Sequence, residues 1–193
     1  VCTTHGMEET DVKFKITKLS KDKHIIHEIN DKPAVPELLR LLDWPEDFLN
    51  DETMLKIMPY YPISLKRGGR EVPAVMTLIL MDSIYMPCLM DNDEVSILTV
   101  SGEKIVNALE DNLRHFNNVQ PEFGLTSSCI TILETFGSRI WTLKESMSRY
   151  FREKPFLMFW CAGEGTYSPT NGITYANMSF NTGIMGILLT RES

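Results

Sequence analysis

The chain has 193 residues, with 19 lysines and arginines against 26 aspartates and glutamates, which gives a formal net charge of −7. Hydrophobic residues make up 43% and charged residues 23%, a composition that excludes a disordered tail or a low-complexity chain. The acidic balance also excludes a dedicated duplex-binding protein, which would need a basic stripe to neutralise phosphates, so no nucleic-acid partner is expected.

The first third of the chain predicts a hairpin followed by helices. Two β-like runs, 12–19 and 24–29, flank a polar turn. Asp31 is expected to cap a helix over 34–42, with Pro33 just inside it, where a missing N–H costs no hydrogen bond. A second short helix is predicted for 45–57.

The middle of the chain predicts β structure. Strands are expected at 60–65, 74–81, 83–89 and 94–100. A tight basic turn over 66–70 follows the first of them. Ser101 is then expected to cap a helix that runs to about 118 and carries one apolar stripe.

The last third alternates β runs with an amphipathic helix. The expected elements are a β run over 128–135, a helix over 138–154, a strand over 156–161, a glycine-rich loop over 162–172 and a β run over 173–189. Each predicted helix has only one apolar face, so it has to pack on a sheet.

These elements predict an α/β or α+β fold, in which amphipathic helices pack on a mixed β-sheet as a single domain. No repeat or linker interrupts the stretch 12–190, which is expected to be that domain. The chain opens on Val1 and not on Met, which suggests a piece of a longer protein.

Cysteine usage and hydropathy bear on the compartment. The four cysteines have no CxxC spacing, which predicts buried free thiols and no disulfide framework: Cys2, Cys88, Cys129 and Cys161. The N-terminus lacks the apolar segment of a signal peptide, and the most apolar stretch, 72–90, is broken by two prolines and an aspartate. We therefore expect a cytoplasmic protein with no direct membrane insertion.

No catalytic or metal-binding constellation stands out. His24 and His27 lie three apart in an expected strand, where their side chains point to opposite faces, so a metal pair is not expected. Cys161 has no histidine after it in the chain to act as a base. The glycines around Glu164 make only half of a dinucleotide fingerprint. The sequence therefore predicts a protein that is not an enzyme and holds no metal.

One segment near the C-terminus has the residues of a small polar pocket. Trp160 ends an aromatic strand, Glu164 and Tyr167 follow in a loop, and Tyr175 and Asn177 begin the next strand. Glu164 would hold an amine, and the Asn177 amide would offer both a donor and an acceptor. From the residues alone, the simpler interpretation is a long hairpin loop that its polar side chains tie down.

The order of features along 13–189 resembles the C-terminal domain of the FIST family (F-box and intracellular signal transduction proteins). One matching segment is Ile25-Ile26-His27-Glu28-Ile29-Asn30-Asp31-Lys32-Pro33-Ala34, which leads into an apolar helix. The others are Phe159-Trp160-Cys161-Ala162-Gly163-Glu164 and Asn177-Met178-Ser179. One departure is that many members carry Cys-x-x-Arg after the strand corresponding to 128–133, where this chain has Leu133-Glu134-Thr135-Phe136-Gly137-Ser138-Arg139.

The resemblance implies a non-catalytic sensory domain that binds small ligands such as amino acids. It also implies an N-terminal FIST domain as a neighbour, so that residues 1–11 are a linker or the tail of a preceding domain, and a signalling output protein or domain as a partner. Our first hypothesis is thus a cytoplasmic small-molecule-sensing domain of a signal transduction protein, with no cofactor.

Two alternatives stay open. One is a protein-interaction scaffold without a ligand, with an exposed apolar patch on the methionine-rich run 81–90. The other is a haem-based gas sensor that uses one of the four histidines.

Overall fold

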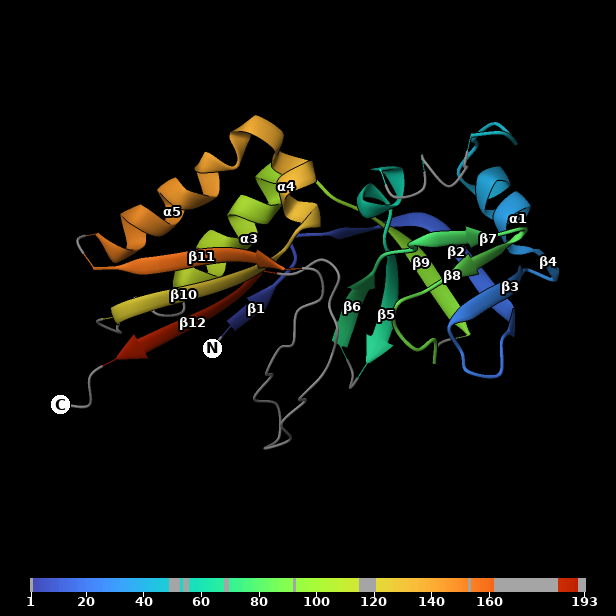
Figure 1. Cartoon of the computed structure of the whole chain (residues 1–193), viewed down its shortest axis with the longest axis horizontal. Coiled ribbons are helices and arrows are strands. Elements are labelled where there is room, and N and C mark those ends of the chain that lie inside the picture. The colour runs from blue at the N-terminus through green and yellow to red at the C-terminus, as the bar shows by residue number, and fades with distance from the viewer. Residues whose placement is uncertain are drawn as a thin grey trace. The chain divides into compact units, whose positions relative to one another are not determined.

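The protein forms a mixed α/β structure, as the sequence predicts (Figure 1). The computed structural model describes residues 2–48, 53, 56–67, 70–91, 93–114, 121–152, 154–161 and 184–190. They belong to two compact units, one over 8–99 and one that combines 1–7 with 100–193. The sequence did not predict this division, which arises because two sheets each collect a separate hydrophobic core.

The segment interpreted as a tail, 1–11, carries regular structure. Strand β1 (Cys2–Thr4) pairs with a strand near the end of the chain, and β2 begins at Glu8. The two strands belong to different units. That a further domain precedes the chain stays a prediction.

The 8–99 unit is an antiparallel sheet with the strand order β6-β5-β9-β2-β3-β8-β7 and β4 beside β3. Its elements are β2 (Glu8–Leu19), β3 (Ile25–Ile29), β4 (Lys32–Pro33), α1 (Ala34–Leu41), η1 (Met58–Tyr60), β5 (Ile63–Arg67), β6 (Arg70–Ala74), β7 (Leu78–Leu80), β8 (Ser83–Tyr85) and β9 (Glu94–Thr99). Strand β2 alternates exposed lysines with buried Phe14 and Ile16, the period-2 pattern of a strand with one buried face. The predicted hairpin of β2 and β3 is confirmed.

The predicted cap at Asp31 is wrong. Asn30 and Asp31 have φ angles of 52° and 61° and form the turn between β3 and β4, where both residue types tolerate a positive φ. The residue before α1 is Pro33, whose φ of −51° suits a helix start.

The helix predicted over 45–57 does not begin at Pro45, because the Phe48 N–H donates to the Pro45 carbonyl in a turn. Residues 53, 56 and 57 of that range are helical, and 49–52, 54 and 55 lie outside the described residues.

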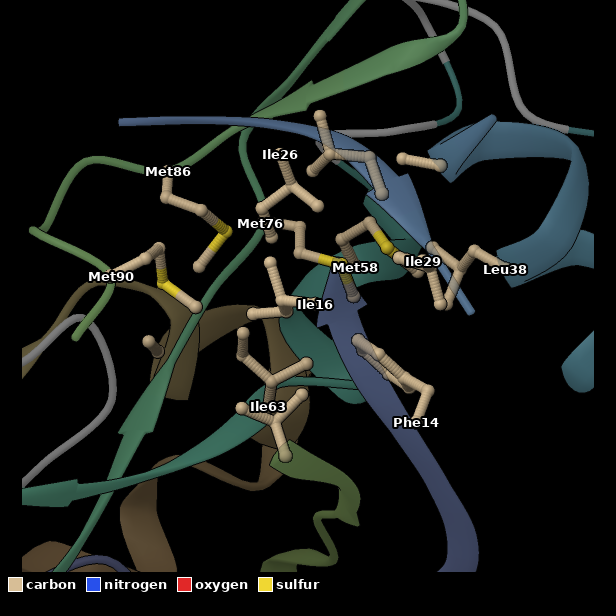
Figure 2. Close-up of a cluster of buried hydrophobic side chains, with 14 of the residues drawn as sticks. Phe14, Ile16, Ile26, Ile29, Leu38, Met58, Ile63, Met76, Met86 and Met90 are labelled. Atoms are coloured by element: carbon tan, nitrogen blue, oxygen red, sulfur yellow. The ribbon is translucent and has the colours of Figure 1, made fainter. Parts of the chain in front are cut away.

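Methionines fill much of the core of the 8–99 unit. Figure 2 shows Met58, Met76, Met86 and Met90 pointing in among Ile and Phe side chains from several strands. All four methionines are fully buried. Because Met86 and Met90 are buried, the predicted patch over 81–90 cannot be built from them. A long, unbranched thioether fills irregular gaps, which suits a core between curved strands.

Exposed apolar side chains lie instead on the β7–β8 hairpin. Leu78 and Leu80 are 45% and 42% exposed, and Met81, in the turn, is 92% exposed with a φ of 58°. A left-handed backbone at a residue with a Cβ costs about 1–2 kcal/mol.

We therefore expect Met81→Gly to stabilise the protein by about 0.5–1 kcal/mol. Glycine relieves the backbone strain of the folded state, and the higher conformational entropy of the unfolded chain offsets part of that stabilisation. Urea denaturation measures the change. Met81→Ala removes the same exposed side chain but keeps the Cβ, so it should leave the stability nearly unchanged. A destabilised Met81→Gly variant would contradict this account.

The second unit has a mixed sheet in the order β1-β12-β10-β11. Its other elements are α3 (Gly102–Arg114), β10 (Pro121–Cys129), α4 (Thr131–Phe136), η2 (Gly137–Arg139), α5 (Trp141–Phe151), β11 (Phe156–Cys161) and β12 (Ile184–Thr190). Strands β10 and β11 are parallel, and α4, η2 and α5 form the crossover between them (Figure 1). The prediction of helices packed on a mixed sheet is confirmed in this unit.

Two predictions for this unit have opposite outcomes. The cap at Ser101 is confirmed, because its Oγ accepts a 3.3 Å hydrogen bond from the Lys104 N–H. The β run predicted over 128–135 is wrong: β10 ends at Cys129, and α4 begins two residues later. The β-branched residues there favour a strand, but helical spacing lets Ile132 and Phe136 bury together against α3 and α5.

The prediction of buried free thiols is confirmed for two of the four cysteines. Cys88 and Cys129 are buried free cysteines, as expected. Across the described ranges, no helix combines the length and the hydropathy needed to pass through a bilayer.

Candidate functional site

The site begins with a difference in side-chain size between two neighbouring strands. The helix-facing residues of β10 include Gly124 and Thr126, which pair in register with Phe156 and Met158 on β11. Small residues on β10 let α5 come close, so that the Phe151 ring lies directly over Gly124. At the paired positions β11 carries larger side chains. An open space lies above β11, next to α4 and the start of α5.

This space is a cavity of about 570 Å³ in the 100–193 unit. Its wall is almost entirely apolar, with residues from α4, the start of α5 and β11: Leu133, Ile140, Trp141, Lys144, Lys154, Pro155, Phe156, Met158 and Trp160. A volume of several hundred Å³ with few polar groups is typical of small-molecule sites.

The polar groups in the wall are all hydrogen-bond donors. The Trp160 indole Nε1 is shielded from solvent and has no hydrogen-bond partner in the part of the chain that the structure describes. Lys144 Nζ lies 5.2 Å from the centroid of the Trp141 ring, a cation–π distance. Lys154 Nζ lies 3.1 Å from Glu122 Oε2. A buried donor without an acceptor is costly, so the Trp160 N–H favours a ligand that displaces what shields it and accepts a hydrogen bond.

Trp160 is the one predicted site residue whose position is described, and it lies in the cavity wall. The others lie outside the described residues, and their role in the site stays a prediction: Glu164, Tyr167, Tyr175 and Asn177. Trp141 and Lys144 are wall residues that the sequence does not predict. Trp141 is 63% exposed and lies off the buried stripe of α5. A large aromatic side chain away from the apolar face of a helix is the sequence feature that could have indicated a binding site here.

A pair of carboxyl groups in the 8–99 unit, Glu9 and Glu71, shares a hydrogen bond. Ser96 Oγ donates a 2.6 Å hydrogen bond to Glu9 Oε1, which lowers the pKa of Glu9. A hydrogen bond with Glu9, together with burial, raises the pKa of Glu71. The ammonium groups of Lys13 and Lys66 offset the charge of the pair. We assign this cluster to structure, because it joins β2, β9 and β6.

The described histidines are held by local hydrogen bonds. His24 Nδ1 lies 2.9 Å from the Met86 carbonyl oxygen, and His27 Nδ1 lies 3.0 Å from Ser83 Oγ. His5 Nδ1 accepts from the Met7 N–H at 3.1 Å, and burial lowers the pKa of His5. Among the described residues, no group of three or more His, Cys, Asp or Glu side chains gathers to hold a metal ion.

No family model matches the chain, and neither a curated protein nor a solved structure matches it. The resemblance to the FIST family therefore stays a prediction. The class of site, an apolar cavity with a buried donor on an α/β sheet, follows from geometry alone.

Proposed function

We propose that the protein is a small-molecule-sensing domain of a cytoplasmic signal transduction protein and that its ligand binds in the cavity above β11. The observation that supports this proposal most directly is the buried Trp160 N–H in an otherwise apolar wall. The resemblance to FIST C-terminal domains points to the same class of function. An N-terminal FIST domain and a signalling output partner belong to this proposal.

The location of the cavity suits a sensor. Its walls come from β11 and from the α4–η2–α5 crossover, which are joined by side-chain packing as well as by the chain. A ligand shifts a conformational equilibrium only as far as it binds one state better than another. A ligand between β11 and α5 would contact both elements, so its affinity would depend on their separation.

A thermal-shift screen of the whole chain against amino acids, organic acids and related metabolites tests the proposal. We expect at least one compound to stabilise the protein, since a ligand at about 100 times its Kd contributes about 2.7 kcal/mol. Leu133→Trp, which adds an indole to the cavity wall, should abolish that stabilisation. Ile130→Trp is the matched control, because Ile130 is 49% exposed and outside the cavity lining.

The two variants also separate a loss of binding from a loss of folding, because each unliganded melting temperature is measured in the same screen. A panel with no stabilising compound, or a shift that Leu133→Trp leaves intact, would contradict ligand binding in this cavity.

A second candidate is the protein-interaction scaffold. The observation that favours it is the set of exposed apolar side chains in the 8–99 unit, chiefly Leu78, Leu80, Met81 and Leu89. This candidate and the first differ in one result of the same screen: a scaffold without a ligand should be stabilised by none of the compounds. The haem-sensor hypothesis keeps its own test, the absorbance spectrum after reconstitution with haemin.

A further inference from the structure

We infer that the cavity above β11 selects ligands with an apolar body and an anionic end, such as aryl- or alkyl-carboxylates, and disfavours amines. This inference rests on the proposed function and names its ligand class. It is independent of the amine-binding role predicted for Glu164.

The apolar part of the preference follows from the wall. Leucine, isoleucine, proline, phenylalanine, methionine and two tryptophan side chains line the cavity. Phe156 is further fixed by its stack with Phe151, whose ring centroid lies 5.7 Å away. Binding an apolar ligand removes both its surface and that of the wall from water, which contributes about 25 cal/mol per Å².

The anionic part of the preference follows from the polar groups. The described lining side chains carry two indole N–H groups and two ammonium groups, and none of them carries a carboxylate. A bound ammonium group would meet these donors and no carboxylate among the described lining side chains. A carboxylate would attract the lysines and, once it displaces what shields Trp160 Nε1, accept from that N–H, and hydrogen bonds to a charged group are about twice as strong as neutral ones.

Lys144 is the more available of the two cations. Lys154 already pairs with Glu122, whereas Lys144 has no carboxylate partner among the described residues and lies over Trp141. The neighbouring acidic side chain on α5 is Glu145, which is exposed and lines a shallower depression with Trp141 and Lys144 but not the cavity itself. The chain as a whole has a net charge of −7, so a preference for anions has to come from local groups.

A matched set of probes on one phenylpropyl frame tests the inference by isothermal titration calorimetry on the whole chain. The probes are 3-phenylpropionate, L-phenylalanine, 3-phenylpropanol and 3-phenylpropylamine. We expect 3-phenylpropionate to bind about tenfold more tightly than 3-phenylpropanol, because one charge-assisted hydrogen bond replaces a neutral one. L-Phenylalanine, with an added ammonium group, should bind less tightly than 3-phenylpropionate, and the amine should bind most weakly.

Two variants test whether Trp160 and Lys144 cause the preference for a carboxylate. Trp160→Phe keeps a ring in place and removes the N–H, and Lys144→Met keeps the length and removes the charge. Each should weaken the carboxylate about three- to tenfold and leave the alcohol within twofold. Lys104→Met is the control, because Lys104 is exposed on α3 and outside the cavity lining while the net charge changes equally. Circular dichroism melting checks that each variant folds.

The outcomes separate the two proposals. Equal affinity for all four probes, or tightest binding of the amine, would overturn the anion preference and leave the ligand-binding function in place. Carboxylate binding that neither Trp160→Phe nor Lys144→Met weakens would place the anion elsewhere and would also overturn it. Failure of all four probes to bind would count against both the preference and the cavity as a ligand site.

Discussion

Gly124→Ala is expected to destabilise the protein by about 2 kcal/mol, a large effect for one added methyl group. An alanine Cβ at this position would overlap Cζ of Phe151 and lie 2.7 Å from both Cε1 and Cε2 of the same ring. The ring is 2% exposed and packs against Tyr150 and Phe156, so it cannot swing into solvent. The small gain from the reduced entropy of the unfolded chain does not offset this clash. Urea denaturation followed by circular dichroism measures the change.

Two further variants make the Gly124 result specific. Gly102→Ala adds the same methyl group at the start of α3, where the nearest atom of Phe136 lies 3.4 Å away, so its effect should stay within about 0.5 kcal/mol. In a Phe151→Leu background, Gly124→Ala should cost less than in the wild-type protein, because the smaller side chain leaves room. Additive effects of the two substitutions would show that the clash with Phe151 is not the cause.

Glu37→Gln is the second substitution with a large expected effect, a destabilisation of about 2 kcal/mol at pH 7. The Glu37 side chain is 2% exposed, and its carboxylate accepts hydrogen bonds of 2.8 and 2.7 Å from Nε and Nη2 of Arg40. Lys32 Nζ and Asn30 Nδ2 each donate at 3.3 Å. Glutamine keeps the shape but loses the charge and turns an N–H₂ group toward these donors. Because the Arg40 side chain is 60% exposed, water can solvate its guanidinium in the variant, and this limits the loss of stability.

The same carboxylate makes the stability depend on pH. The hydrogen bonds from Arg40 lower the pKa of Glu37 in the folded protein from 4.5 to about 2. A lowered carboxyl pKa stabilises the folded state fully above the unfolded value, and this stabilisation is lost as the pH falls toward the folded value. The difference in unfolding free energy between wild type and Glu37→Gln should therefore be constant from pH 7 to about 5 and shrink between pH 4.5 and 2.

Urea denaturation at a series of pH values measures this difference. Glu46→Gln, at an exposed position, is the control for a lost negative charge and should change the stability by less than about 0.5 kcal/mol. A difference between wild type and Glu37→Gln that stays constant down to pH 2 would contradict the assignment of the low pKa to Glu37.

Much of the fold was predictable because it is encoded locally. Alternation along β2, the polar turn after it and the Ser101 cap are each decided by a few neighbouring residues. The Asn30–Asp31 turn was misread because Asp favours both helix caps and left-handed turns, and only the pairing of Ile29 with Lys32 decides between them. The start of α4 was misread because tertiary burial of Ile132 and Phe136 overrode the β-branched residues.

The cavity was predictable only in part. Trp160 was selected as the end of an aromatic strand, and it does line the cavity. The opposite wall could not be found from the sequence, since Trp141 and Lys144 face β11 only because α5 belongs to the crossover between two parallel strands. Side chains that meet through a crossover have no fixed spacing in the sequence. The small residues of β10 and the larger ones of β11 meet through a register that is a property of the folded sheet.

The pairing of β1 with β12 has a consequence for the order in which the units complete during synthesis. Cys2 is in register with Gly186, so β1 has to wait for β12 before it finds its neighbour. The 8–99 unit is continuous in sequence and has all of its strands as soon as Thr99 is made. Closing a long loop costs chain entropy, and domains that emerge first fold first. On the ribosome, we therefore expect the antiparallel unit to form before β1 pairs with β12 and before the sheet that carries the cavity is complete.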